Sequence, residues 1–496
     1  MNKNIALYLI FVIFLFSCSG KKDTDKLIIG VNSSLILGNN NPVFIQRNAN
    51  VWETLTLIDD NYEPKPCIAK KWESFENGKL WVLEIYNNIK YHNGEILKPE
   101  HIVANIYRFK EYPELDFYSV YNFLDTAYVK DNKIFIKFSK SSIDYPKKVG
   151  HYFAGIFHPK SFDNSGRISN LLATGPYSLK EYKIGKYELV EYFDDYRDFK
   201  PKYQKVEFRI ITDPTIRLLA LIKGDIDIIA HHGGVQSYQI EFLKKYSFIR
   251  IDSFKLGITH YLIFNYKSQF FKSYKNRLAL NNSINRYELV NKILMNKGYP
   301  ADDFFVPENK PWSKKRFNLS NSNVINFFNS KVDREINIVV NQSDISNWGY
   351  KLTAEYLYSI LKKYSISSRI KIVEPGTYKK LISNGDFDIT LYPLSIPTGT
   401  PELFLRNLIY SKGLSVKNSS NLSHIKDKEM DLMIESAIYA ENEIKQNNLF
   451  NEILNKVADS CFILPLYHEK YYLAYNQKVS KLHLDPFLKL DLIKIK

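Results

Sequence analysis

The chain has 496 residues, of which 45% are hydrophobic and 24% charged, with only 19 Pro and 20 Gly. This composition is typical of a globular protein and excludes a disordered, collagen-like or low-complexity chain. At about 150 residues per domain, the length predicts roughly three domains or two large lobes. The formal net charge is +15, but the basic residues are spread singly or in short runs without a nucleic-acid-binding motif. We therefore expect no nucleic-acid partner and interpret the charge as a solvated surface near an anionic membrane.

Residues 1–17 have the pattern of a signal peptide. A short basic start is followed by an apolar stretch over residues 5–16, which is too short to cross a bilayer as a permanent helix. The ending Leu-Phe-Ser-Cys18 resembles a bacterial lipobox, in which the Cys becomes the acylated first residue of the mature chain. We therefore expect lipidation at Cys18, a polar tether over residues 18–25 and an extracytoplasmic, lipid-anchored protein. An ordinary signal peptide with an incidental Cys is the alternative.

Two further cysteines occur, and both lie in apolar surroundings. Cys67 is followed by Ile-Ala, and Cys461 by Phe-Ile-Leu. We predict that both are buried thiols, since no metal-type Cys spacing is present and a protein of this size needs no disulfide framework.

From residue 26 onward, short apolar and β-branched runs alternate with helical patterns, which predicts an α/β fold. Strands are expected at residues 26–31, 80–85, 127–129, 133–138, 187–193 and 205–211. Pro99 begins a helix over residues 99–110. Asp213 and Pro214 open a second helix, which ends at Gly224 and is followed by a strand at residues 225–230.

A second unit begins near Thr259. It is predicted to contain a strand at residues 261–265 and a long helix at residues 275–297. A strand-helix-strand-helix-strand series follows, at residues 335–340, 350–364, 369–373, 377–383 and 387–392. The short connections in this series favour a compact parallel sheet.

This order of elements predicts two lobes, with the second inserted between two parts of the first. The expected ranges are lobe I at residues 26–257 with an extra subdomain at about 45–185, lobe II at 258–470, and a return to lobe I at 471–496. Strands that cross twice between lobes form a hinge, expected near residues 255–260 and 465–475. Such a pair of lobes encloses a cleft that can close on a ligand.

Several short motifs follow one another along the chain: Pro-Cys-Ile-Ala-Lys-Lys-Trp72, Tyr91-His-Asn-Gly, Thr-Gly-Pro-Tyr177 and Asn285-Arg. In this order they resemble the extracytoplasmic solute-binding proteins of ABC importers, in the peptide/nickel class (family 5). The resemblance implies an α/β, two-lobed periplasmic-binding-protein-like fold of type II, with a ligand cleft between the lobes. It also implies a monomer without cofactor or catalytic residues, which delivers its ligand to the transmembrane subunits of an ABC permease.

One segment is similar to the nickel-binding branch of that family. Residues 211–227 contain Asp-Pro-Thr-Ile-Arg and, further on, Gly-Asp-Ile-Asp. The physical roles of Asp213, Pro214 and Gly224 are to cap, start and end a helix. The segment therefore identifies the nearest relatives without itself forming a binding site.

The residues that hold the ligand in the nickel-binding members are only partly matched. The aromatic wall has a counterpart at Tyr118, but no Arg occurs near residues 152–155, Ser395 stands where a Trp is expected, and residues 406–415 contain no His. The peptide-binding members hold the ligand's ammonium with an Asp, whereas here residues 392–401 contain no acid before Glu402. A buried ammonium without a carboxylate is strongly disfavoured, which argues against peptides with a free N-terminus.

Three histidines are the candidate metal ligands. His231 and His232 directly follow the predicted strand at residues 225–230, and ligands of open α/β sheets bind beyond the carboxyl ends of strands. His468 lies where the chain crosses back between the lobes. Since imidazole suits Ni, Cu and Zn, we predict that these three residues contact the metal. The counterpart of the aromatic wall, Tyr118, is predicted to contact the ligand. Loop histidines without a ligand are the alternative.

The sequence thus predicts a lipoprotein that captures a nickel or similar divalent-metal complex in an interlobe cleft. An oligopeptide- or dipeptide-binding protein of a peptide importer is the alternative. A secreted hydrolase is a remote alternative, because the sequence has no Gly-x-Ser-x-Gly, no His-Glu-x-x-His and no phosphate-binding Gly loop.

Overall fold

The computed structural model describes residues 25–35, 49–116, 118–151, 153–230, 234–306, 310–320, 328, 334–413, 421–487 and 489–496. The predicted signal peptide, the lipidation residue Cys18, and the pair His231 and His232 lie outside these ranges. Within them, every helix is too short or too polar to span a bilayer.

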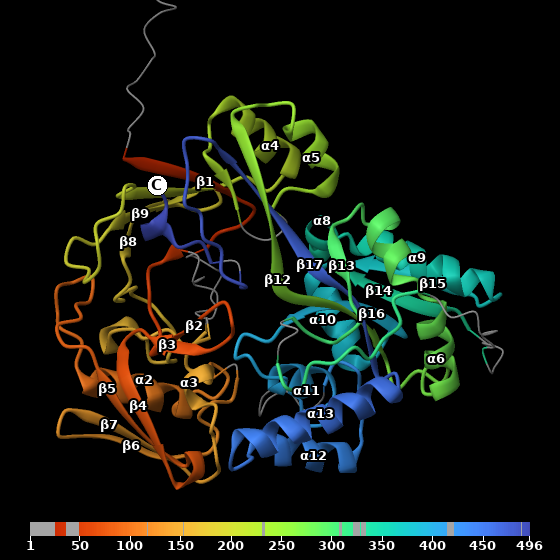
Figure 1. Cartoon of the computed structure of the whole chain (residues 1–496), viewed down its shortest axis with the longest axis horizontal. Helices are drawn as coiled ribbons and strands as arrows, with labels where there is room; N and C mark the ends of the chain where they lie inside the picture. The colour runs from red at the N-terminus through yellow and green to blue at the C-terminus, as the bar shows by residue number, and fades with distance from the viewer. Residues whose placement is uncertain are drawn as a thin grey trace, which may run out of the picture.

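The molecule has two lobes, and one mixed sheet of 11 strands runs through both (Figure 1). In lobe I the sheet contains β1 (Lys26–Val31), β8 (Tyr177–Lys183), β9 (Tyr187–Tyr192), β10 (Lys205–Ile210) and β11 (Ile228–Ile229). In lobe II it contains β13 (Gly298–Pro300), β14 (Ile336–Asn341), β15 (Ser368–Val373) and β16 (Ile389–Ser395). The strands β12 (Ile249–Phe264) and β17 (Ile463–Asn476) connect the lobes. The order across the sheet is β15-β14-β16-β12-β17-β11-β1-β10-β9-β8, with β13 paired to β17.

The two connecting strands pair antiparallel over most of their length. The ladder extends from Ile249 opposite Asn476 to Ile263 opposite Ile463, and its register shifts between Lys255 and Thr259 and again just after His260. Such irregularities bend a strand and increase its twist. The expected hinge ranges fall on these two strands, and bending of the molecule there stays a prediction.

Lobe I is built around β1, which pairs parallel with both β10 and β11. Its core contains Leu27 and Ile29 of β1 and Phe208 of β10. The C-terminal segment packs into the same core through Leu492 and Ile495, and Figure 1 shows the C-terminus beside β1.

A smaller part of lobe I carries its own antiparallel sheet (Figure 1). The strand order is β4 (Ala69–Phe75), β5 (Leu80–Ile85), β7 (Lys133–Phe138) and β6 (Leu124–Lys130), with the ribbon β2 (Thr56–Ile58) and β3 (Pro64–Pro66) next to it. The helices are α2 (Pro99–Glu111) and α3 (Tyr145–Lys148). A core that includes Trp81, Ile102 and Ile136 joins α2 to this sheet.

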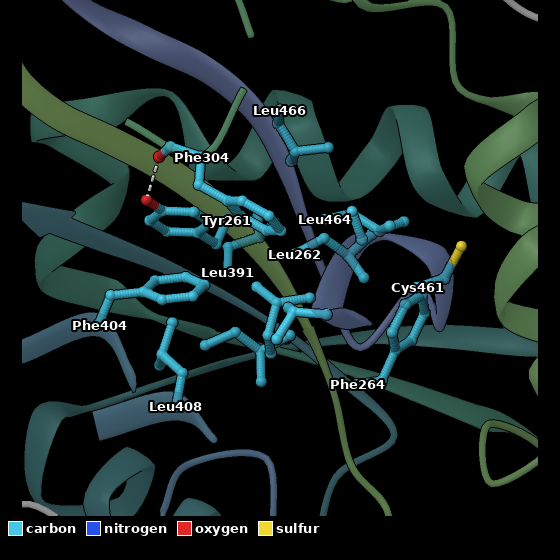
Figure 2. Close-up of a cluster of buried hydrophobic side chains, with 14 of the residues drawn as sticks. Tyr261, Leu262, Phe264, Phe304, Leu391, Phe404, Leu408, Cys461, Leu464 and Leu466 are labelled. Carbon is cyan, nitrogen blue, oxygen red and sulfur yellow. Dashed lines mark hydrogen bonds between the residues drawn. The ribbon is translucent and has the colours of Figure 1, made fainter. Parts of the chain in front are cut away.

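Lobe II contains the predicted parallel sheet, since β14 pairs parallel with both β15 and β16. Its helices include α8 (Gln342–Trp348), α9 (Tyr350–Lys363), α10 (Pro375–Asn384), α11 (Glu402–Leu408), α12 (Lys428–Ile438) and α13 (Glu443–Asp459). Figure 2 shows part of the lobe II core, where Tyr261 of β12 lies near Phe404 of α11 and Leu262 lies near Leu464 of β17. The hydroxyl of Tyr261 donates a hydrogen bond to the carbonyl oxygen of Phe304.

Most predicted elements are confirmed by the structure. The strands at residues 26–31, 80–85 and 133–138 have the expected bounds. Helix α4 (Pro214–Lys223) is capped as predicted, because the Asp213 carboxylate accepts from the backbone N–H groups of Thr215 and Ile216, and Gly224 ends the helix at φ 78°. Both Cys67 and Cys461 are buried free thiols, and burial raises their pKa to about 12 and about 11.

Several predicted elements are wrong in extent. The strand expected at residues 225–230 is limited to Ile228–Ile229, and two other differences are larger. The expected helix at residues 275–297 is broken, because α6 (Tyr274–Ser283) ends and the Asn285 side chain caps a new turn by accepting from the backbone N–H of Glu288. The strand expected at residues 261–265 begins already at Ile249. It carries polar residues in its first half, so its hydrophobic pattern is visible only near its end.

Two of the family motifs meet in lobe I. His92 Nε2 donates to the Gly175 carbonyl oxygen at 3.0 Å, and burial lowers the pKa of His92 to about 4, which keeps the ring neutral. A Cβ at Gly175 would lie 2.3 Å from the Val51 carbonyl carbon, so only glycine fits there. Both motifs therefore serve the fold.

Candidate ligand site between the lobes

Tyr118 lies where the lobe I subdomain meets lobe II. Its ring is buried, with its centroid 4.0 Å from that of His151 and 5.9 Å from that of Phe153. The same hydrophobic cluster includes Leu394 at the end of β16 and Leu403 of α11. Tyr118 therefore belongs to a hydrophobic cluster that aliphatic residues of lobe II also join at the interface.

Four buried charged side chains, which we call the interlobe ion network, cross the same interface. Lys148 Nζ lies 3.1 Å from Asp144 Oδ1 within lobe I and 2.8 Å from Glu402 Oε2 in lobe II. Arg406 Nε donates to Glu402 Oε1 at 2.9 Å. Each lobe thus contributes one acid and one base, four residues apart on a helix or at its start.

The protonation of this network follows from the balance of burial and pairing. Burial alone lowers the pKa of Lys148, but Asp144 and Glu402 outweigh it and the pKa is raised. Burial alone raises the pKa of Glu402, but Lys148 and Arg406 outweigh it and the pKa is lowered. Lys148 and Glu402 are therefore both charged at neutral pH.

This pairing decides the role of Glu402, the first acid after residues 392–401. Its carboxylate accepts from Arg406 and lies against Lys148, and both cations are themselves buried. An ammonium group brought to Glu402 would have to displace one of these cations into an apolar surrounding, which is costly.

His468, the one predicted metal ligand within the described residues, is a buried residue of β17. Its Nδ1 lies 2.8 Å from Thr259 Oγ1 on the neighbouring strand β12. Burial lowers the pKa of His468 to about 3, so the ring is neutral. The described residues contain no group of three His, Cys, Asp or Glu side chains placed to hold a metal ion. The structure thus locates Tyr118 at the interface and His468 on a connecting strand, and does not test their contact with a ligand.

A cavity of about 300 Å³ also lies between the lobes, and we call it the interlobe pocket. It is lined by Asn61, Glu63, Lys147, Lys310, Pro311, Trp312, Gly399, Thr400, Glu443, Gln446 and Asn447. Glu63 accepts from Lys310 Nζ at 2.6 Å and lies 3.2 Å from Lys147 Nζ. These residues come from widely separated parts of the chain, and for this reason the sequence did not indicate the pocket.

The model of the bacterial extracellular solute-binding proteins, family 5, matches residues 63–415. The chain belongs to this family. The resemblance of its sequence motifs is thereby confirmed. Family 5 proteins bind solutes outside the cytoplasm for ABC importers, and at this level the chain is a transport protein rather than an enzyme.

Curated family 5 relatives include both substrate classes. The oligopeptide-binding protein AppA of Bacillus subtilis is 21% identical, over 99% of this chain and 97% of its own length. The nickel-binding periplasmic protein of Escherichia coli is 25% identical, over 52% of this chain and 50% of its own length.

The solved structures confirm the two-lobed family 5 fold. The structure of NikA from Brucella suis in complex with Fe(III)-EDTA superposes with a TM-score of 0.81 at 20% identity, covering 95% of this chain and 99% of that one. NikZ from Campylobacter jejuni in complex with Ni(L-His) gives 0.78 at 18% identity, with the same coverage. AppA in complex with a nonapeptide gives 0.74 at 19% identity, again with the same coverage.

Sequence reasoning missed Lys148 and Arg406. A signal was present, since Asp144 and Lys148, like Glu402 and Arg406, have the i, i+4 spacing of a helical ion pair. That spacing is common on solvated helices, however, and it does not reveal that two such pairs meet.

Proposed function

We propose that this chain is a lipid-anchored solute-binding protein that captures a chelated nickel ion, or a similar divalent-metal complex, and delivers it to an ABC permease. The observation that carries the proposal is the interlobe ion network beside Tyr118. It engages the carboxylate of Glu402. In our proposal, opening of the lobes separates the hydrophobic cluster of Tyr118, Leu394 and Leu403, and this cluster then offers the ligand an aromatic and aliphatic surface. Such a surface suits the carbon skeleton of a chelator, which packs well against aromatic rings.

A metal that arrives already chelated needs few protein ligands. This fits the described residues, in which no three metal-binding side chains converge. Two structural neighbours were also solved in complex with chelated metals, Fe(III)-EDTA and Ni(L-His). His231, His232 and His468 remain our proposed contacts that complete the coordination of a partly chelated metal.

A peptide ligand is the second candidate, because relatives over most of the chain include oligopeptide- and dipeptide-binding proteins. The engaged carboxylate of Glu402 argues against a free peptide N-terminus, but not against a peptide bound through its backbone.

Native mass spectrometry of the purified chain distinguishes these candidates. We expect a mass increase with a preformed nickel–histidine complex, little uptake of bare Ni²⁺, and no retention of peptides from a mixture. Retained peptide without uptake of the metal complex would overturn the proposal.

Two sets of variants test the named residues. Tyr118→Ala is expected to weaken binding of the nickel–histidine complex about tenfold, or about 1.4 kcal/mol, as the aromatic contact is lost. Tyr128→Ala, which removes an exposed tyrosine of the same lobe, is the matched control. The triple variant that changes His231, His232 and His468 to Ala tests the histidines. If it binds the nickel–histidine complex with unchanged affinity, these histidines are not metal ligands, although the protein still binds a metal complex.

The anchoring and the hinge are tested separately. Cys18→Ala should release the protein from the membrane fraction, and retention there would contradict lipidation. Closure of lobe I (residues 26–257 with 471–496) on lobe II (residues 258–470) should compact the monomer when the ligand binds. Scattering curves of empty and fully loaded protein that superpose would contradict closure.

A further inference from the structure

Helices α4 and α5 (Ser237–Leu243) lie next to each other at the end of the molecule where β1 begins (Figure 1). The side-chain amide of Gln239 on α5 donates a hydrogen bond to the carbonyl oxygen of Pro214 on α4, at 3.3 Å. Leu221 of α4 and Leu243 of α5 belong to the same hydrophobic cluster. Each helix therefore buries one face in lobe I, and the two helices are held together as a unit.

On the outer faces of these helices, large apolar side chains are exposed to solvent. Ile216 and Leu219 of α4 are 60% and 52% exposed, and Tyr238 and Phe242 of α5 are 61% and 40% exposed. A spacing of three or four residues places each pair on one face of its helix. The pairs are neighbours, because burial lowers the pKa of Arg217 on α4 and Tyr238 is among the groups close enough to oppose this shift. We call the four exposed side chains the α4–α5 patch.

Lysines border the α4–α5 patch. Lys223 at the end of α4 is 79% exposed, and Lys244 directly after α5 is 60% exposed. The Nζ of Lys245 lies 5.8 Å from the ring centroid of an aromatic residue of the patch. Asp225 lies 3.4 Å from Lys223, and Glu241 lies 2.5 Å from Lys244. Such exposed ion pairs contribute little in water, so the phosphates of lipid head groups can compete for these lysines.

The first strand, β1, begins beside this unit. Lys26 Nζ lies 2.6 Å from Glu207 Oε2, and Arg209 Nε donates to Oε1 of the same carboxylate at 2.7 Å. Arg209 Nη1 also donates to the backbone carbonyl oxygen of Asp225, two residues after α4 ends, at 2.8 Å. These contacts connect the start of β1 to the C-terminal end of α4.

The predicted tether is too short to take this end of the molecule far from a membrane. Residues 18–25 are eight residues, which span at most about 29 Å when fully extended. A compact chain of 496 residues is about 60 Å across. A lipid on Cys18 would therefore hold the start of β1 closer to the bilayer than the molecule is wide.

We propose that the α4–α5 patch is a membrane-docking surface, which rests on the anionic lipid bilayer to which the chain is anchored. This inference depends on the proposed lipid anchor, which brings the patch to the bilayer. The four apolar side chains enter the boundary between head groups and acyl chains, and the surrounding lysines contact the anionic head groups. An exposed apolar patch with a polar rim is typical of such a surface. Docking then fixes which side of the anchored protein faces the bilayer.

Co-sedimentation with lipid vesicles tests the patch without the anchor. The chain from residue 19 onward contains every described residue and lacks Cys18, so it cannot be lipidated there. We expect it to bind vesicles of phosphatidylcholine with about 30% phosphatidylglycerol, and to bind at least threefold less when the anionic lipid is omitted. Raising the NaCl concentration from about 50 mM to about 300 mM should also weaken binding, because salt screens the lysines.

A pair of double variants tests the position of the surface. Ile216→Ser with Leu219→Ser should weaken vesicle binding at least fivefold, because two aliphatic side chains no longer leave water. Leu432→Ser with Ile444→Ser is the matched control, since these aliphatic residues of lobe II are 65% and 76% exposed. The control should bind as the unchanged chain does. Substitutions at such exposed positions have little effect on stability, and circular dichroism checks that both variants are folded.

Three outcomes would overturn the proposal. They are absence of binding to anionic vesicles by the unchanged chain, equal binding by the two double variants, and binding that requires membrane proteins in the vesicles. The last result would show that the patch contacts a protein and not lipid.

The vesicle assay and the test of the lipid anchor have separate outcomes. The assay contains neither the anchor nor a metal complex, so its failure leaves the proposed anchoring and the capture of a metal complex untouched. Docking through the patch alone is reversible and sensitive to salt. A salt wash should therefore release the Cys18→Ala protein from the membrane fraction, and its retention after the wash would contradict lipidation only.

Discussion

The two faces of helix α11 hold the molecule together in different ways. Phe404 and Leu408 point into the apolar core of lobe II, which Figure 2 shows. Glu402 and Arg406, on the same helix, belong to the interlobe ion network. One face of α11 therefore stabilises a lobe, and the other connects the two lobes.

If the predicted hinge opens this interface, the difference explains why its charges are already paired within each lobe. When the lobes part, Lys148 keeps Asp144 and Arg406 keeps Glu402, so each lobe retains a neutral pair. Water then hydrates these groups. An apolar face such as that of Phe404 would instead be exposed to water on each opening, at about 25 cal/mol for every Å². The core thus fixes the structure of lobe II, whereas each half of the ion network would keep its own ion pair if the lobes separated.

The largest effect on stability is expected from the core. Phe404 is fully buried, and its ring centroid lies 5.3 Å from that of Tyr261 and 5.2 Å from that of Phe304. Phe404→Ala should lower the free energy of unfolding by about 3–5 kcal/mol through the cavity it leaves. Urea denaturation measures this. Phe199→Ala, at an exposed position, should change it by less than about 0.5 kcal/mol. If both variants lower the free energy of unfolding equally, Phe404 does not stabilise the lobe II core as described.

The ion network should affect closure more than unfolding. Lys148→Met leaves Asp144 and Glu402 facing each other in the closed form, which we expect to be destabilised by about 3 kcal/mol relative to the open form. The free energy of unfolding should fall less, because opening hydrates both carboxylates. Scattering and denaturation of the same samples compare the two quantities. Lys244→Met, at an exposed ion pair of α5 (Ser237–Leu243), should leave both unchanged. If Lys148→Met lowers the free energy of unfolding but leaves the scattering curve of the closed form unchanged, the ion network stabilises the fold and not closure.

The smallest effect concerns pH and the connecting strand β17. Burial lowers the pKa of His468 to about 3, whereas an unfolded histidine has about 6.5. The unfolded chain therefore binds a proton more readily, and the free energy of unfolding falls as the pH drops from about 6.5 toward about 3. The slope from this one residue is about 1.4 kcal/mol per pH unit.

His468→Leu should remove this contribution, so its unfolding free energy should depend less steeply on pH below about 6.5 than that of the wild type. Denaturation over a series of pH values gives the two slopes. His483→Gln, which changes an exposed histidine, is the control and should keep the wild-type slope. Parallel curves for the wild type and His468→Leu would show that His468 does not titrate in this way.

The amino-acid sequence determined the local structure. The cap at Asp213, the stop at Gly224 and the apolar run of β1 act over a few neighbouring residues, and each was predicted from those residues. The broken helix at residues 275–297 was missed, although Asn285 carried a capping signal. The family too was readable, because its motifs are short and ordered along the chain.

Only the tertiary structure decided which charges meet between the lobes. Lys148 and Glu402 are about 250 residues apart in the sequence, and so are Glu63 and Lys310. These residues meet because the paired strands β12 and β17 connect the lobes and fix how one lobe lies against the other. The sequence identified Glu402 as the first acid after residues 392–401 but did not show that it is engaged. The i, i+4 spacing along a helix predicts ion pairs between neighbouring turns. Contacts between the lobes depend instead on how the lobes pack, which a local sequence pattern does not predict.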